Sequence, residues 1–178
     1  MVAYFALTPI LATMKLPITE DAIMTVESNT DRIVKTVDIR AGIDRVWRAL
    51  TDHEEFGSWF QVKLDGPFIV GTRSTGHITY PGFEHEPWES FIKEMKAPSY
   101  FAFTWHPYAV DHSIDYSKEP PTLVEFRLEP IEAGTRLTVI ESGFDALPAE
   151  RRPLALRMNE GGWEEQVGNI KRHAENGR

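Results

Sequence analysis

The chain has 178 residues, of which 42% are hydrophobic, and this is enough for one domain with a single core. Its 19 Lys and Arg residues against 27 Asp and Glu give a net charge of −8, which disfavours binding to nucleic-acid phosphates and to anionic membrane surfaces. Cysteine is absent, so disulfides, thiolate nucleophiles and cysteine-based metal sites are excluded. Since the sequence also lacks a glycosylation motif, we expect a cytoplasmic protein.

Residues 1–30 are predicted to be an extension, and the folded domain is expected to span residues 31–178. The apolar run 2–14 is not preceded by positive charge, contains Pro9, and is too short to cross a membrane as a helix. These features disfavour a signal or anchor, and two other interpretations are favoured. The extension is either a peripheral arm that packs on the domain or on a second subunit, which would allow a homodimer, or the product of an upstream start codon before Met24.

The first part of the domain is predicted to be a strand followed by two short helices. β-branched residues dominate residues 32–40 and indicate a strand, which Ala41-Gly42 ends. Asp52 is well placed to cap the second helix, which Trp59-Phe60 ends. The first helix is indicated by apolar residues at spacings of three and four, namely Ile43, Val46, Trp47 and Leu50.

The middle of the chain is predicted to consist of strands. The runs are residues 71–80, 88–95, 100–106, 122–129 and 136–144. A turn at 132–135 makes the last two a hairpin, and residues 107–118 form the longest loop. Alternation puts three sets of residues on inward faces: Phe101, Phe103 and Trp105; Val124, Phe126 and Leu128; Leu137, Val139 and Glu141.

Pro148 is predicted to open a long terminal helix. Its apolar stripe consists of Leu156, Trp163, Val167, Ile170 and Ala174. Gly161-Gly162 in its middle costs about 1 kcal/mol per glycine, so we expect a bend or a close approach there. A meander with one apolar face must be covered, and this helix is the only element large enough. The sequence therefore predicts an α+β fold, with an antiparallel sheet of about six or seven strands wrapped around one long C-terminal helix.

Several short motifs, in their order and spacing, resemble the SRPBCC superfamily of START and birch-pollen-allergen-like helix-grip domains. Within it they resemble the branch named for the activator of the ninety-kilodalton heat-shock protein ATPase. The resemblance covers about residues 31–174. It implies a deep, mostly apolar cavity between sheet and helix, where members bind hydrophobic molecules or catalyse cyclisations. The motifs are Arg45-Val-Trp-Arg-Ala-Leu-Thr-Asp52, Trp59-Phe60, Phe103-Thr-Trp105, Gly134-Thr-Arg-Leu-Thr-Val139, Ser142-Gly-Phe144 and Gly162-Trp163.

Large aromatic side chains are the candidate ligand contacts, although each one also suits a packed core. They favour a neutral hydrophobic or aromatic ligand, and no cofactor is expected. The predicted ligand-binding set is Trp59, Phe60, Phe101, Phe103, Trp105, Tyr108, Phe126, Glu141 and Trp163.

Glu141 is the sharpest candidate, because a carboxylate on an apolar strand face must be paired, solvated or protonated. A raised pKa would suit general acid–base chemistry in a cofactor-free cyclase, dehydratase or hydrolase, with His77 as a second group. The alternatives are a register slip of one residue, or an ion pair with Arg152 or Arg157. A third function, a chaperone-cofactor or stress-response interaction module, rests on the family name alone.

The long loop contains two histidines and two aspartates, whose spacing matches no known metal site. His85-Glu86 likewise lacks the second histidine of a zinc-protease helix. No metal is therefore predicted. The loop is instead expected to cover the cavity mouth, with Tyr108 and Tyr116 as contacts. The four loop residues considered as ligands are His106, Asp111, His112 and Asp115.

Overall fold

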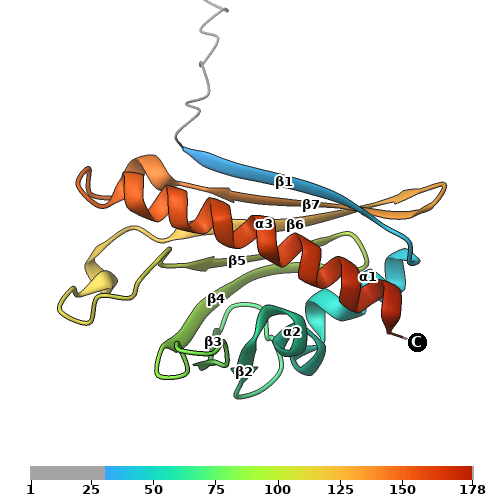
Figure 1. Ribbon diagram of the computed structural model, residues 1–178, viewed down its shortest axis with the longest axis horizontal. Helices are drawn as coiled ribbons and strands as arrows, with labels where there is room; N and C mark the ends of the chain where they lie inside the picture. The colour runs from blue at the N-terminus through green and yellow to red at the C-terminus, as the bar shows by residue number, and fades with distance from the viewer. Residues whose placement is uncertain (1–30, 178) are drawn as a thin grey trace, which may run out of the picture.

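The computed structural model describes residues 31–177. Within them, a long helix crosses one face of a curved sheet, and two short helices lie near its C-terminal end (Figure 1). The elements are β1 (Arg32–Ile39), α1 (Ile43–Thr51), α2 (His53–Phe60), β2 (Val62–Leu64), β3 (Arg73–Ile78), β4 (Pro87–Lys96), β5 (Tyr100–Trp105), η1 (Tyr116–Lys118), β6 (Thr122–Ile131), β7 (Gly134–Ser142), η2 (Phe144–Ala146) and α3 (Arg152–Asn176).

The sheet has seven antiparallel strands in the order β1-β7-β6-β5-β4-β3-β2. This confirms the predicted α+β helix-grip fold. The sequence does not predict β2, because three residues are too few to display an alternating pattern. The pairing of β2 with β3 also requires a glycine at position 76 of β3. A Cβ on Gly76 of β3 would lie 2.2 Å from the Lys63 carbonyl oxygen.

Strand register explains where the core lies. Phe101 of β5 pairs with Phe126 of β6, which pairs with Val139 of β7, and all three are almost completely buried. The rings of Phe101 and Phe126 stack 5.8 Å apart. Because alternate residues share a face, the inward sets predicted for these strands meet in one layer beneath α3. α3 presents four buried side chains to this layer: Ala155, Trp163, Ile170 and Ala174.

The two short helices are fixed by polar contacts as well as by packing. Oδ1 of Asp52 accepts from the backbone N–H groups of Glu54 and Glu55, which confirms the predicted cap of α2. Trp59 Nε1 donates to the Ala49 carbonyl over 2.8 Å and so joins α2 to α1. Oε2 of Glu55 also lies 2.9 Å from Nε2 of His173, which holds the C-terminal end of α3 against these helices.

Two expectations for α3 were wrong or incomplete. The helix begins at Arg152 rather than at Pro148, because Pro148 starts a turn whose carbonyl accepts from the N–H groups of Arg151 and Arg152. A Cβ on Gly161 or Gly162 would have no neighbour within 4 Å, so close approach does not explain them. The expectations for residues 1–30 lie outside the described residues. Among the helices the structure describes, none is long and apolar enough to cross a membrane.

Candidate functional site

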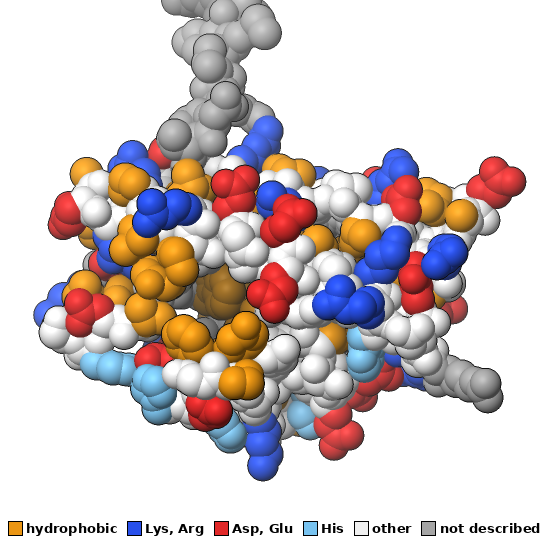
Figure 2. Space-filling model, in the orientation of Figure 1, with side chains coloured by type: hydrophobic (Ala, Val, Ile, Leu, Met, Phe, Trp, Pro, Cys, Tyr) orange, Lys and Arg blue, Asp and Glu red, His pale blue; other side chains and the backbone are white. Residues whose placement is uncertain are grey.

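The described residues enclose a cavity of about 620 Å³ at one end of the sheet. It lies between the β3–β4 connection (79–86) and the loop after β5 (106–121). Figure 2 shows a hollow on this face with hydrophobic side chains gathered around it. α2 and α3 contribute Phe60 and Gln166 to the wall. A volume of this size is typical of pockets for small organic ligands.

The inner wall of the cavity is aromatic. Phe60 and Trp88 meet edge to face with centroids 5.1 Å apart, and Trp88 lies 5.5 Å from Trp105. The mouth is apolar too, where Tyr80 and Phe83 are 42% and 48% exposed. Rings at these separations offer both flat faces and edges to a ligand.

Polar groups also line the cavity. Glu86, Glu89 and Asp111 contribute three carboxylates to its lining. The pKa of His106 is lowered from its ordinary value, chiefly because burial disfavours the charged ring, so its imidazole adds no positive charge at neutral pH. These groups disfavour an anionic ligand and can hydrogen-bond to a neutral or cationic one.

Arg151, at the start of α3, anchors the loop after β5, which forms one wall of the cavity. Its Nε donates to Glu119 over 2.7 Å, and both side chains are only 10% exposed. Its Nη1 donates to the carbonyl oxygens of Pro107 and Tyr108, and its guanidinium lies over the Tyr116 ring. Tyr108 is held with φ at 46°, a left-handed conformation that is costly for a side chain of this size. Arg151 therefore ties several parts of this loop to the start of α3.

Glu141 points into the core, as its strand face predicts, and no register slip occurs. Its partners are neutral, and neither Arg152 nor Arg157 pairs with it in the hydrogen bonds and ion pairs of residues 31–177. Oε1 accepts from Trp105 Nε1 at 2.7 Å and from Thr122 Oγ1 at 2.6 Å. Oε2 accepts from Trp163 Nε1 at 2.6 Å, and Asn159 Nδ2 lies 3.0 Å from both oxygens. Burial raises the pKa of Glu141, and these donors only partly offset it.

A smaller pocket of about 100 Å³ is lined by three residues that donate hydrogen bonds to Glu141, namely Trp105, Asn159 and Trp163. Glu141 itself does not line this pocket. Phe60, Trp105 and Gln166 belong to both the small pocket and the large cavity, so the two adjoin. Glu141 thus holds two indole rings, Trp105 of both walls and Trp163 of the small pocket, without lining either space.

The structure separates the predicted ligand-binding residues into two groups. Phe60, Trp105 and Tyr108 line the large cavity, and Trp163 lines the small pocket. The others lie in the core or behind the wall, lining neither: Trp59, Phe101, Phe103, Phe126 and Glu141. His77 is exposed on β3, where it pairs with Lys63 of β2.

The residues considered as metal ligands in the loop are also separated. Asp111 and Asp115 accept hydrogen bonds from Ser113 and Ser117 and so cap their own turns. His112 instead reaches across to Glu86, beside His85. Among the described residues, these three are the group whose ligand atoms lie within 4.8 Å of one another.

Sequence reasoning missed several lining residues. Trp88 lies in a predicted strand, and its inward position follows from alternation with Ile92, so this signal was available. Tyr80, Phe83 and Gln166 carried no comparable signal, because the first two lie in an irregular connection and the third is polar on a helix.

Comparison with known proteins agrees with this fold. The family model described as Activator of Hsp90 ATPase homolog 1-like protein matches residues 40–175. A search of curated proteins found no match to this sequence.

Solved structures provide similar folds at low identity. A protein of Mesorhizobium loti aligns with a TM-score of 0.65 and 21% identity, over 83% of this chain and 98% of its own. A protein of Nitrosomonas europaea aligns with a TM-score of 0.65 and 16% identity, over 85% of this chain and 98% of its own. DynU16, from the dynemicin biosynthetic locus, aligns with a TM-score of 0.64 and 22% identity, over 83% of this chain and 48% of its own. Because the family model covers most of the described domain, the chain belongs to the family of Activator of Hsp90 ATPase homolog 1-like proteins.

Proposed function

We propose that this protein binds a small, mostly apolar molecule with a flat ring system in the large cavity. The observation that carries the proposal is the wall of Phe60, Trp88 and Trp105 beside about 620 Å³ of space. A ligand stacked there would remove apolar surface from water on both sides, which is the main source of affinity in such pockets. Members of this fold commonly bind hydrophobic molecules, which supports the same conclusion.

The polar groups that line the cavity indicate which charge a ligand can carry. Glu86, Glu89 and Asp111 line the cavity together with the rings, and the chain as a whole carries a charge of −8. An anionic ligand would be repelled by both. We therefore expect a neutral or weakly basic molecule with one polar end that faces the loop.

An acid–base enzyme that uses Glu141 has less support from the geometry. Both carboxylate oxygens of Glu141 accept hydrogen bonds, and the residue is 0% exposed. No free face remains for a substrate proton. His77 does not line the cavity either.

An interaction module would need an apolar face outside the cavity. Tyr80, Phe83 and Ile114 are exposed large apolar side chains that line the large cavity, and Met158 lines the small pocket. Ligand binding accounts for these four only. The other exposed large apolar side chains of the described residues line neither: Val34, Ile69, Val70, Phe91 and Leu154.

Fluorescence titration with the neutral probe N-phenyl-1-naphthylamine tests the proposal. We expect about one probe per chain. Binding should weaken by about fivefold or more in the double variant Phe83→Ala, Ile114→Ala, because apolar contacts at the mouth are lost. It should be abolished in Ala109→Trp, whose side chain would fill part of the cavity.

Phe91→Ala is the matched control, because Phe91 is 39% exposed and does not line the cavity. Circular dichroism of each variant checks that the fold is retained. Equal probe affinity in the wild type, the double variant, Ala109→Trp and the control would overturn the proposal.

A further inference from the structure

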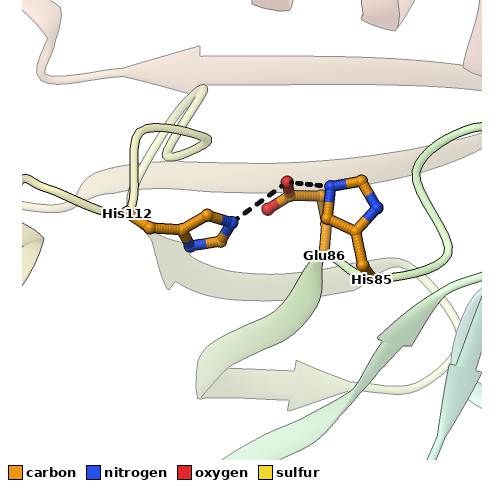
Figure 3. Close-up of side chains that lie close together, drawn as sticks. All are labelled: His85, Glu86 and His112. Carbon is orange, nitrogen blue, oxygen red and sulfur yellow. Dashed lines mark ion pairs between the residues drawn. The ribbon is translucent and has the colours of Figure 1, made fainter.

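His85, Glu86 and His112 bring three potential metal ligands together from two distant segments. His85 and Glu86 end the β3–β4 connection, and His112 lies in the loop after β5. Figure 3 shows both imidazole rings directed toward the Glu86 carboxylate from opposite sides. The Nε2 atoms of His85 and His112 lie 3.0 and 3.3 Å from the same oxygen, Oε1 of Glu86.

We propose that these three side chains bind one divalent transition-metal ion, with Zn²⁺ as the best fit. Zn²⁺ takes histidine nitrogen at about 2.0–2.1 Å and carboxylate oxygen at about 2.0–2.2 Å, in tetrahedral geometry. Ligand atoms around such an ion lie about 3.4 Å apart, close to the separations seen here. Small rotations of the two imidazoles, whose side chains are 67% and 65% exposed, would complete the site.

The Glu86 carboxylate is buried, which distinguishes this cluster from an ion pair on the surface. Glu86 is only 8% exposed, so its charge has little water to solvate it. A buried carboxylate needs a compensating partner. Among the ion pairs of residues 31–177, its partners are these two histidines, and neither a Lys nor an Arg pairs with it. A divalent cation would supply the missing positive charge while the imidazoles remain neutral.

The ligand set also restricts which metal would bind. Two nitrogens and one oxygen suit Zn²⁺, Ni²⁺, Co²⁺ and Cu²⁺, whereas Mg²⁺ and Ca²⁺ require mostly oxygen ligands. Three protein ligands leave at least one coordination position open. Glu86 and His112 both line the large cavity, so the ion would lie at its edge, within reach of a polar group in that space.

The site would also join two walls of the cavity. The β3–β4 connection and the loop after β5 are far apart in sequence, and the metal would tie one to the other. Binding to the folded state alone stabilises it by mass action. We therefore expect Zn²⁺ to raise the melting temperature and to slow hydrogen exchange in residues 106–115.

The test uses the full chain without a histidine tag, which would bind the same metals. Isothermal titration calorimetry with Zn²⁺ gives stoichiometry and affinity, and absorption spectra with Co²⁺ report tetrahedral nitrogen and oxygen coordination. We expect about one ion per chain and no binding of Mg²⁺. Zn²⁺ affinity should fall by about tenfold or more in both His85→Ala and His112→Ala.

His77→Ala is the matched control, since His77 is also exposed on this part of the chain but lies outside the cluster. Its Zn²⁺ affinity should equal that of the wild type. Glu86→Gln keeps the size of the side chain and should weaken Zn²⁺ binding without removing either imidazole. Absence of binding, or equal affinity in the wild type, His85→Ala and His112→Ala, would overturn the proposal. Ligand binding in the cavity is measured independently of these results.

Discussion

Glu141 is the residue whose role changes most between sequence and structure. It was singled out as an acid–base group, and its side chain does point inward with a raised pKa. However, its donors are two indole N–H groups, the NH₂ group of an amide and a hydroxyl, and neither the indole N–H groups nor the NH₂ group can accept a hydrogen bond. Such a carboxylate is an acceptor that orients Trp105, in the wall of the large cavity, and Trp163, in the wall of the small pocket, which is a positioning role.

Replacing Glu141 by Leu should destabilise the fold. Leu accepts no hydrogen bond, so the buried indole, amide and hydroxyl donors lose their acceptor, and an unsatisfied buried donor costs about 1–3 kcal/mol. Urea unfolding at pH 7 would measure this loss.

The pH dependence of stability tests the raised pKa of Glu141, with Glu141→Gln as the reference that cannot titrate. Because the folded state binds the Glu141 proton more tightly than the unfolded state does, protonation favours folding. The stability of the wild type relative to Glu141→Gln should therefore increase as the pH falls from the folded-state pKa to about 4.5, the ordinary value. A difference that stays flat, or grows as the pH rises, would contradict this assignment.

At the scale of elements, helix α3 both packs against the core and lines the small pocket. Its buried side chains cover the central strands, and Asn159, Gly162 and Trp163 line the small pocket. The glycine pair in its middle is the weak point, because glycine has poor helix propensity and no steric need for it exists here.

Gly161→Ala should therefore stabilise the protein by about 1 kcal/mol, since the added methyl group has open space and the helix gains propensity. Thermal unfolding followed by circular dichroism would show a higher midpoint. Gly76→Ala provides the contrast, because its Cβ would clash with the Lys63 carbonyl and should lower the midpoint. A midpoint for Gly161→Ala at or below the wild-type value would mean that the glycine is required for another reason.

At the scale of the whole molecule, the cavity depends on contacts between segments that are distant in the chain. Arg151 joins the start of α3 to the loop after β5 through a buried ion pair with Glu119 and two backbone carbonyls. This loop forms one wall of the cavity and carries His112.

Arg151→Gln should loosen that wall. Loss of the cation leaves Glu119 buried without its partner, and breaking such a pair typically costs about 3–5 kcal/mol. Hydrogen-exchange mass spectrometry should show faster exchange in residues 107–119 and a lower global stability. Arg157→Gln, an exposed position on the same helix, should change neither. Unchanged exchange in Arg151→Gln would show that the loop is held by other contacts.

Much of the fold could be predicted because periodicity is a local property. Alternation in β5, β6 and β7 and the three-and-four spacing in α1 reflect burial of one face, so these elements can be recognised without a neighbour. The start of α3 was misplaced because Pro148 suits both a turn and a first helical turn. β2 was missed because its existence depends on pairing with β3.

The composition and the residue pattern alone determined the fold class, the inward face of Glu141 and the aromatic character of the interior. Only the tertiary structure decided which rings reach open space and which fill the core, because that depends on which distant segments surround each ring. Likewise, the sequence contains His85-Glu86 and His112 as unrelated fragments 26 positions apart. They form one cluster only because the antiparallel pairing of β4 and β5 brings the β3–β4 connection and the loop after β5 to the same end of the sheet.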